Sequence, residues 1–376
     1  MKTSWKSCTS PALLLDTRIA LRNLDRMAEK AQRAGARLNP HFKTHQSAAC
    51  VPWFTERGCT GITVSSLKMA AYFADAGCTD ITVLFPVNIR DINRINALVS
   101  KVKLTLNVIS VEASRFLHKH LTHPVTVLVE VDAGYGRTGI SVNDTGQIRA
   151  LLECFQELQF PFYGFYIHAG HTYDAANRNE VAAIHQQGLS ALKALLTAWE
   201  PVFPELKISM GDTPACSMLD NFDGIDEIRP GNFIFYDLTM AAIGACEFTD
   251  IAVCMACPVV AKHESRTEIV VHGGAIHLSK DWLMQKAPDG SNQMIFGRPV
   301  PIFDHHWGEP MQDCYVRKLS QEHGIIKLTQ PEFDRIQVGD LIGVLPVHSC
   351  LTADCMGAYL TETGDTIEMM KWREMK

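Results

Sequence analysis

Lys43 is the residue whose surroundings point most directly to covalent chemistry. It lies in the segment Asn39-Pro40-His41-Phe42-Lys43-Thr44-His45, where an apolar run ends and a helix-like stretch begins. An aromatic ring and two imidazoles beside the amine would partly desolvate it and give it cationic neighbours. Both effects favour the neutral amine that Schiff-base chemistry requires. The alternative is a surface lysine in a loop between a strand and a helix.

A second group of reactive residues, His348-Ser349-Cys350, follows 305 residues later. An imidazole and a thiolate two positions apart can both ligate one metal ion, and two protein ligands leave coordination positions open, as in catalytic sites. The soft thiolate favours zinc, whereas a carboxylate in its place would favour magnesium or manganese. The alternative is a buried turn cysteine beside a half-exposed histidine.

The elements that must position these residues begin with eight short β-branched runs that alternate with helical periodicity. They are Arg37–Lys43, Gly61–Ser65, Asp80–Phe85, Lys103–Ile109, Val125–Asp132, Phe162–His168, Lys207–Gly211 and Glu227–Arg229. The first helix is predicted to start at an Asp16/Thr17 cap and to stop before Gly35. Eight such units predict a closed (βα)8 barrel.

The pattern changes near residue 245 to alternating strands separated by Gly, Pro and Asp turns. These strands are Ile251–Val260, Thr267–Val271, Cys314–Leu319, Gly324–Leu328 and Asp340–Leu345, followed by a hairpin around Thr363-Gly364-Asp365. We therefore expect a barrel over residues 10–244 and a β domain made of residues 1–9 and 245–376. The barrel would carry Lys43, and the β domain would carry the His348–Cys350 loop.

Barrel active sites lie at the C-terminal ends of the strands, and the loops after strands 7 and 8 often hold phosphate. Here those loops contain Gly211 with Thr213, and Gly231 with Asn232. Glycine allows close backbone approach, and the two polar side chains can donate to phosphate oxygens. Tight turns into helices would explain each loop separately, but both lie where a phosphate site is expected.

Two other strand ends carry polar groups. Strand 5 leads into the glycine-rich turn of residues 132–139, which would aim Arg137 inward. Strand 6 leads into His168, His171 and Tyr173. A lone histidine is usually a satisfied core residue, but two imidazoles and a phenol at a barrel mouth point to a functional site.

The bulk composition excludes several function classes. The chain has 376 residues, 47% hydrophobic and 20% charged, with a net charge of −6. It is neither basic enough for a nucleic-acid footprint nor apolar enough over any stretch for a membrane span. The N-terminus lacks a signal-peptide core, so we expect a cytoplasmic protein. Twelve dispersed cysteines suit a reducing compartment, and Cys254 and Cys257 are interpreted as buried strand residues rather than a zinc or redox pair.

Taken together, these motifs resemble the D-serine dehydratase and D-threonine aldolase family, the metal-dependent branch of the alanine-racemase-like, fold-type III pyridoxal-phosphate enzymes. The resemblance covers nearly the whole chain and rests on Pro40-His41-Phe42-Lys43-Thr44-His45, Asp132-x-Gly134-x-x-Arg137-x-Gly139, His168-x-Gly170-His171, Gly211-x-Thr213-Pro214, Arg229-Pro230-Gly231-Asn232 and His348-x-Cys350. It implies a Schiff base between Lys43 and pyridoxal phosphate, with Arg137 facing the pyridine nitrogen and His168 near the ring. By the same resemblance the phosphate candidates are Tyr173, Gly211, Thr213, Gly231 and Asn232, Tyr236 lies close by, and the metal ligands are His348 and Cys350.

The resemblance also implies the activity. Dehydratases of this family resemble the chain in carrying His-x-Cys, whereas the aldolases typically carry His-x-Asp. We therefore expect a D-serine dehydratase-like β-elimination, in which Lys43 removes the α-proton and zinc assists loss of the β-hydroxyl of a D-amino acid. The alternatives are a D-threonine or 3-hydroxy-D-amino-acid aldolase, with His168 or a metal-held water as the base, and an amino-acid racemase. A non-catalytic pyridoxal-phosphate carrier is disfavoured by residues 245–376, and the resemblance suggests a homodimer.

Three features fall outside this pattern. The stretch His272-Gly273-Gly274-Ala275-Ile276-His277 stands where relatives often carry an acidic residue and a lysine, and Met210 and Asp212 flank Gly211 where small residues are commoner. Substrate preference is therefore open. The tandem Asp304-His305-His306-Trp307 is interpreted as a polar loop, because adjacent histidines cannot easily share one ion.

Overall fold

The structure is a computed structural model that describes residues 4–287 and 289–371. The chain divides into two compact units. The barrel unit comprises residues 25–43 and 50–231, and the β unit comprises the described residues within 1–24, 44–49 and 232–376. Residues 10–24 and 232–244, which the sequence prediction assigned to the barrel, fall in the β unit in this division. The domain boundaries at residues 9/10 and 244/245 stay a prediction.

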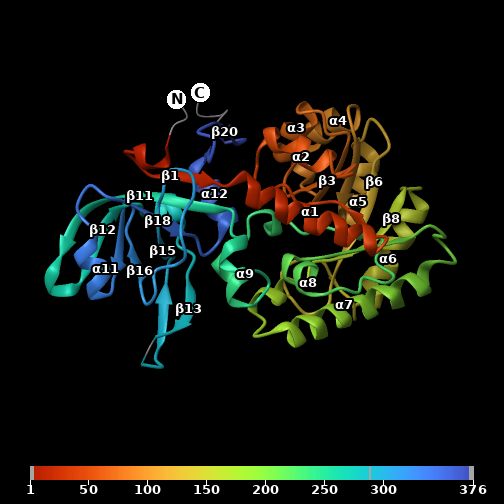
Figure 1. The fold of residues 1–376 in the computed structure, drawn as a ribbon. Coiled ribbons are helices and arrows are strands. Elements are labelled where there is room, and N and C mark those ends of the chain that lie inside the picture. The colour runs from red at the N-terminus through yellow and green to blue at the C-terminus, as the bar shows by residue number, and fades with distance from the viewer. Residues whose placement is uncertain (1–3, 288, 372–376) are drawn as a thin grey trace. The chain divides into compact units, whose positions relative to one another are not determined.

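The barrel unit is built on parallel strands in the order β2-β10-β9-β8-β6-β5-β4-β3, as Figure 1 helps to follow. Their bounds are β2 Arg37–Leu38, β3 Ile62–Val64, β4 Asp80–Pro86, β5 Lys103–Asn107, β6 Thr126–Asp132, β8 Phe162–Ile167, β9 Lys207–Met210 and β10 Glu227–Ile228, with a short β7 Ile140–Ser141 beside β6. A parallel bridge between His41 and Thr63 joins the extension of β2 to β3 and so links the two ends of the strand order. All eight predicted strands are confirmed.

Helices alternate with these strands and cover them. They are α1 Thr17–Arg33, α2 Val51–Thr55, α3 Leu67–Asp75, α4 Ile92–Val99, α5 Val111–His120, α6 Thr145–Glu157, α7 Arg178–Trp199 and α8 Thr213–Met218. The predicted first helix is confirmed at both ends. Asp16 accepts hydrogen bonds from the backbone N–H groups of Arg18 and Ile19, and Gly35 follows the helix with a φ of +65°.

A buried ion pair fills part of the barrel interior. Arg229 pairs with Glu227, and its Nε and Nη1 atoms donate to the hydroxyls of Ser209 at 2.7 Å and Thr63 at 2.6 Å. Asn39 donates to the second oxygen of Glu227 at 2.8 Å. A buried charge pair is tolerated only when such partners satisfy it. The network therefore ties strands β2, β3, β9 and β10 together below the strand ends that carry the candidate site.

The β unit contains the strands predicted after residue 245. Its large sheet follows the order β16-β17-β12-β11-β1-β19-β20, with β18 pairing β11 and β15. The bounds are β1 Ala12–Leu15, β11 Val253–His263, β12 Glu268–His272, β15 Arg298–Pro301, β16 Tyr315–Leu319, β17 His323–Lys327, β18 Leu341–Leu345, β19 Ala358–Thr361 and β20 Thr366–Glu368, with a separate hairpin of β13 Leu283–Lys286 and β14 Asn292–Ile295. Its helices are α9 Leu238–Ala242, α10 Ala275–Leu278, α11 Gln330–Arg335 and α12 Ser349–Met356. Cys254 and Cys257 are fully buried in β11, as predicted.

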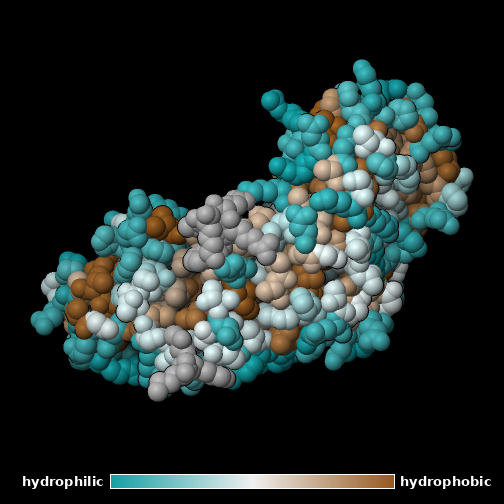
Figure 2. Space-filling model, turned by 90° about the horizontal axis from the view of Figure 1, so that it is seen from above, coloured by the Kyte–Doolittle hydropathy of each residue, from teal (hydrophilic) through white to brown (hydrophobic). Residues whose placement is uncertain are grey.

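The face shown in Figure 2 mixes hydrophilic and hydrophobic residues. Among the described residues, no helix is both long and apolar enough to span a membrane. All twelve cysteines are free thiols.

Candidate active site

Lys43 lies five residues beyond the end of β2, at the same end of the barrel as the other candidate residues of the barrel unit. Its side chain is exposed, and its backbone N–H donates to Nδ1 of His41 at 3.3 Å. The prediction that an aromatic ring and two imidazoles surround the amine stays a prediction for Phe42 and His45, whose side chains have other contacts. Phe42 turns into the core, where its ring lies 4.6 Å from that of Phe54, and the Nδ1 atom of His45 accepts the N–H of Ser47 at 3.1 Å.

Arg137 is presented by a loop that one carboxylate organises. Asp132, the last residue of β6, accepts hydrogen bonds from the backbone N–H groups of Gly134 and Tyr135 through one oxygen and from that of Gly136 through the other, at 2.8 to 2.9 Å. Gly134 and Gly136 have φ values of +125° and +73°, which favour glycine. The guanidinium stands 3.8 Å from the buried Glu130 of the same strand. The glycine-rich turn therefore holds Arg137 over the end of β6.

His168 immediately follows β8 and is neutral. Burial, together with the charges of Arg137 and Lys43, lowers the pKa of its imidazole to about 3. The same surroundings act on His41, because burial and then Lys43, His168 and two arginines hold its pKa well below the ordinary value. The charges of Lys43 and Arg137 act on both imidazoles, so these four residues of the barrel mouth lie near one another.

The loop after β9 has the features of an anion cradle. Gly211 has a φ of +134°, and a Cβ atom there would lie 2.9 Å from the Sγ atom of Cys216. The hydroxyl of Thr213 is buried without a hydrogen-bond partner among the described residues. The phenol oxygen of Tyr173 accepts the backbone N–H of Thr213 at 3.4 Å. Three of the predicted phosphate residues are thus brought together in the barrel unit.

Asp212 has a structural task in this loop. Its Oδ1 atom accepts the N–H of Ala215 at 2.8 Å and the hydroxyl of Thr172 at 2.7 Å, so it caps α8 and ties the loop after β9 to the loop after β8. Burial raises the pKa of this carboxyl. The larger residue noted in the sequence at this position is therefore accommodated by hydrogen bonds.

Asn232 contacts the predicted metal loop. Gly231 ends the barrel unit, and Asn232 and Tyr236 belong to the β unit. The Asn232 side-chain amide donates to Asp237 at 2.6 Å, to the Ser349 hydroxyl at 3.0 Å and to the Cys350 sulfur at 3.7 Å. In the structure this side chain therefore supports the predicted metal loop, and the phosphate roles of Gly231 and Asn232 stay predictions.

His348 and Cys350 lie together at the start of α12. The Nδ1 atom of His348 is 2.8 Å from an oxygen of Asp281, and Cys350 lies with its sulfur 3.2 Å from the hydroxyl of Thr44. Burial by itself would lower the pKa of His348, but the hydrogen bonds with Asp281 and Cys350 outweigh it and raise that pKa to about 11. A carboxylate on one ring nitrogen orients an imidazole so that its other nitrogen can ligate a metal.

The sequence analysis missed the two carboxylates, Asp281 and Asp237, that hydrogen-bond to this loop. Asp281 stands 67 residues before His348, and no local pattern links them. Asp237 accepts the backbone N–H and the hydroxyl of Ser349, at 3.0 and 3.4 Å, and it also caps α9 by accepting the N–H of Met240. An aspartate just before a helical run is a cap signal, so Asp237 could have been predicted from the sequence as a helix cap. Its support of the Ser349 backbone could not.

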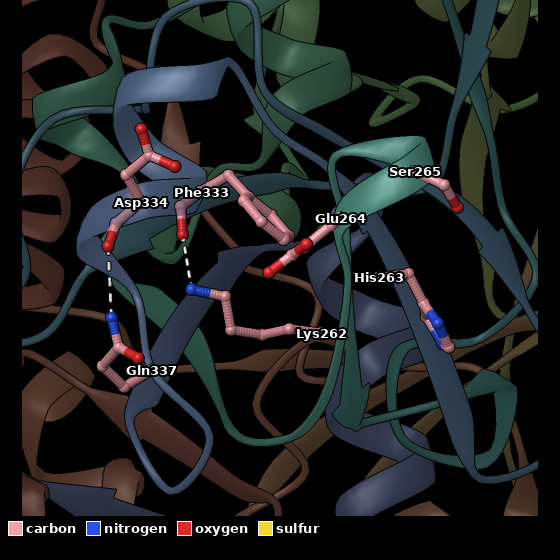
Figure 3. Close-up of a pocket in the computed structure, with 7 residues that line it drawn as sticks. All are labelled: Lys262, His263, Glu264, Ser265, Phe333, Asp334 and Gln337. Atoms are coloured by element: carbon pink, nitrogen blue, oxygen red, sulfur yellow. Dashed lines mark hydrogen bonds between the residues drawn. The ribbon is translucent and has the colours of Figure 1, made fainter.

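Two cavities of the structure are lined by residues other than the candidate residues named above. One of about 320 Å³ lies at the C-terminal ends of β3, β4 and β5 in the barrel unit. A larger, open one of about 650 Å³ belongs to the β unit and is lined by Lys262 to Ser265, Phe333, Asp334 and Gln337. Figure 3 shows the Lys262 ammonium turned toward the Phe333 carbonyl, to which it donates at 2.7 Å. This lysine neutralises the C-terminal end of α11, which is a structural role.

The residues present fit both groups that the resemblance implies. For pyridoxal phosphate, the barrel mouth offers an exposed amine at Lys43, a guanidinium at Arg137, and a buried hydroxyl at Thr213 that lacks a partner. For a metal, the β unit offers a thiol and a carboxylate-oriented imidazole in one turn. Imidazole and thiolate together are donors that zinc prefers.

Comparison with known proteins decides the family. The model of the alanine racemase N-terminal domain matches residues 16–238. The chain belongs to the alanine-racemase-like family. A second model, a putative serine dehydratase domain, matches residues 252–361 and covers most of the β unit of this family member. The predicted fold, enzyme class and resemblance to the D-serine dehydratase and D-threonine aldolase branch are confirmed, so the chain is a pyridoxal-phosphate-dependent lyase.

Relatives within the family align along almost the entire chain. D-threo-3-hydroxyaspartate dehydratase from Delftia sp. strain HT23 is 28% identical, with 97% of each chain covered. Its solved structure superposes with a TM-score of 0.89 over 98% of this chain and 99% of the relative. D-serine dehydratase from Dictyostelium discoideum is 26% identical over 93% of this chain and 92% of the relative. D-threonine aldolase from Filomicrobium marinum, at 21% identity, shares the fold with a TM-score of 0.81 over 98% of this chain and 96% of that one.

Proposed function

We propose that the chain catalyses the β-elimination of a D-configured 3-hydroxy amino acid, with pyridoxal phosphate and a divalent metal, in the manner of D-serine dehydratase. The observation that carries the proposal is the pairing of Cys350 with an Asp281-oriented His348, because the dehydratases of the family resemble this chain in having His-x-Cys at this point. D-Serine would give pyruvate and ammonia. Water leaves in the elimination and is taken up again when the resulting enamine tautomerises and hydrolyses.

Lys43 is the proposed base for the α-proton. Its amine is exposed at the mouth of the barrel, whereas the nearby His168, whose pKa is about 3, is too weak a base to take that proton at neutral pH. The same low pKa weakens the aldolase alternative in the form that assigns His168 as the base for the β-hydroxyl. Bound pyridoxal phosphate supplies an electron sink for the electrons left at Cα, and a bound metal supplies a Lewis acid for the departing hydroxyl.

Arg137 and the loop after β9 are the proposed binding groups of the barrel. A guanidinium cannot give up its proton at ordinary pH, so Arg137 can only donate a hydrogen bond to a ring nitrogen, which leaves that nitrogen unprotonated. Thr213 and the backbone beside Gly211 would donate to phosphate, with the phenol of Tyr173 held next to them. The neutral imidazole of His168 can pack on a cofactor ring without adding a charge.

His348 and Cys350 are the proposed metal ligands, and zinc is the proposed metal. Support comes from two solved variants of a D-threo-3-hydroxyaspartate dehydratase, one with a histidine and the other with a cysteine two positions later changed to alanine. The cysteine variant is described as the metal-free form. That spacing equals the spacing of His348 and Cys350 in this chain.

We also propose a cytoplasmic location and a homodimeric state. The location is supported by the twelve free cysteines.

The test is product analysis on three substrates. The protein, loaded with pyridoxal phosphate and zinc, is incubated separately with D-serine, D-threo-3-hydroxyaspartate and D-threonine, before and after treatment with a chelator. We expect a 2-oxo acid and ammonia from at least one of the first two, with the activity lost on chelation and restored by zinc. Glycine and an aldehyde from D-threonine would establish the aldolase instead, and metal-insensitive inversion of configuration would establish a racemase.

A further inference from the structure

Three further side chains of types that can ligate a metal meet in the β unit, and two of them belong to the stretch that departs from the family pattern. His272 ends β12, His277 lies in α10, and Glu322 directly precedes β17. One oxygen of Glu322 is 3.4 Å from Nε2 of His272 and 3.8 Å from Nε2 of His277. The nearest ligand atoms of all three lie within 4.8 Å of one another, and each residue is half-buried. None of the three is a proposed ligand of the His348–Cys350 centre.

The backbone holds this cluster in place. The N–H of Gly273 donates to the carbonyl of Glu322 at 3.0 Å, and the N–H groups of Ala275 and Ile276 donate to the carbonyls of residues 320 and 321 at 2.8 and 3.2 Å. At Gly274 a Cβ atom would lie 2.4 to 2.6 Å from the backbone of residues 320–322, so the two segments approach more closely than a side chain allows. The ligand groups are therefore carried by two segments that are fixed to each other.

The geometry points to a second divalent metal site: we propose that His272, His277 and Glu322 bind one zinc-class ion. In a tetrahedral zinc site with bonds of about 2.0–2.1 Å, neighbouring ligand atoms stand roughly 3.4 Å apart, close to the two distances to Glu322. The two imidazole rings are nearly perpendicular at 87°, with centroids 5.5 Å apart, so they do not stack and can converge on one ion. Two imidazoles and one carboxylate form a ligand set that leaves one position for water.

In the structure, the Nε2 atoms of both imidazoles face the same carboxylate oxygen of Glu322. The N–H of Gly274 donates to Nδ1 of His277 at 3.2 Å, so the proton of the neutral ring is on Nε2, facing Glu322. A metal at Nε2 takes the place of that proton, the ring proton moves to Nδ1, and the long contact with Gly274 is lost. Metal binding is thus coupled to a change of tautomer at His277.

The site also connects to the His348–Cys350 loop through α10. Leu278, the last residue of α10, accepts the hydroxyl of Thr352 in α12 at 3.1 Å. Asp281, which orients His348, follows three residues later. A metal bound to the residue before Leu278 would restrain the segment that supplies this carboxylate. The second ion is therefore a positioning element for the first centre and not a part of the reacting group.

The test is metal stoichiometry and cobalt spectroscopy on the full chain. Protein stripped with a chelator is re-equilibrated with Zn²⁺ or Co²⁺ and analysed by elemental mass spectrometry, with circular dichroism to confirm folding. We expect two ions per wild-type chain, one in the double variant His272→Gln with His277→Gln, and one in Cys350→Ala. His306→Gln is the matched control and should keep two, because His306 is an exposed imidazole stacked on Phe303.

Cobalt distinguishes the two centres. A cobalt ion at Cys350 shows a thiolate-to-metal charge-transfer band in the near ultraviolet, whereas an ion on His272, His277 and Glu322 shows only ligand-field bands. The ion that remains in Cys350→Ala should therefore lack the thiolate band. The inference is overturned if the double variant binds as many ions as the wild type. Loss of the thiolate band from the wild type, with the other ion retained, would instead overturn the metal centre of the proposed function and leave this site standing.

Discussion

Two histidines, one in each unit, have pKa values that move in opposite directions. In the barrel unit, burial together with Arg137 and Lys43 lowers the pKa of His168 to about 3. In the β unit, Asp281 and Cys350 raise the pKa of His348 to about 11 against the effect of burial. Burial lowers the pKa of both imidazoles, but the cations beside His168 add to that effect, whereas the acidic groups beside His348 reverse it.

The contrast indicates which ligand each region is built to receive. A cluster of cations around neutral imidazoles favours anionic groups such as a phosphate or a substrate carboxylate. A thiol and two carboxylates around an imidazole favour a cation, whether that cation is a proton or a metal. The proposed elimination uses both properties, because the leaving hydroxyl needs a cation while the cofactor and the amino acid carry the negative charge.

Removing the Lys43 amine should have the largest effect on the barrel side of this comparison. For Lys43→Ala we expect kcat to fall by about 10³-fold, since a positioned base contributes roughly 10²–10⁴-fold. The visible absorbance of the bound cofactor should also be lost. Lys101→Ala is the control, because Lys101 is an exposed lysine paired with Asp75. A variant that keeps both the absorbance and a tenth of the rate would exclude Lys43 from its proposed role.

Neutralising Asp281 should weaken metal binding at His348 and Cys350 in the β unit. Asp281→Asn keeps the size of the side chain but removes the charge on Nδ1 of His348, and such changes typically cost about 10–100-fold in metal affinity. Affinity can be measured by competition with a chelating dye. Asp354→Asn, which changes another carboxylate on α12, should leave it unaltered. If Asp281→Asn bound the metal as tightly as Asp354→Asn and the wild type, the Asp281 carboxylate would contribute nothing to the site.

The low pKa of His168 should appear in the pH dependence of stability. The unfolded chain takes up this proton near the ordinary pKa of 6.5, whereas the native chain does so only near 3. Stability linked to His168 is thus fully present above pH 6.5 and is lost as the pH falls toward 3, with a slope of at most about 1.4 kcal/mol per pH unit.

Denaturant unfolding of His168→Gln across this range should therefore show a shallower loss of stability in acid than the wild type. His123→Gln changes an exposed imidazole on the same unit and serves as the control. Parallel acid profiles for the wild type and His168→Gln would mean that neither burial nor the cationic neighbours lower the pKa of this residue.

The smallest expected effect concerns the phosphate loop. Thr213→Val removes a buried hydroxyl that has no partner among the described residues, so the cofactor-free protein should lose no stability. Cofactor affinity should fall about fivefold, which corresponds to the ~1 kcal/mol of one hydrogen bond. Titration of the cofactor by fluorescence quenching measures this, with Thr197→Val as the exposed control. An unchanged affinity would place the phosphate away from this hydroxyl.

What the sequence determined by itself was the local order of the chain. The short β-branched runs, the cap at Asp16 and the glycine turns each depend on residues close in sequence, so all eight barrel strands could be located. The sequence likewise singled out candidates whose roles stay predictions: Lys43, Arg137 and His168 beyond strand ends, and His348 and Cys350 two positions apart.

Only the tertiary structure decided how side chains distant in sequence meet. It packed the ring of Phe42 against that of Phe54, directed Asn232 to the Ser349–Cys350 turn, and placed Asp281 against His348 across 67 residues. Glu322 likewise reaches His272 only because β12 and β17 pair in one register. Such contacts depend on strand register and core packing, which the local spacing of residue types does not encode.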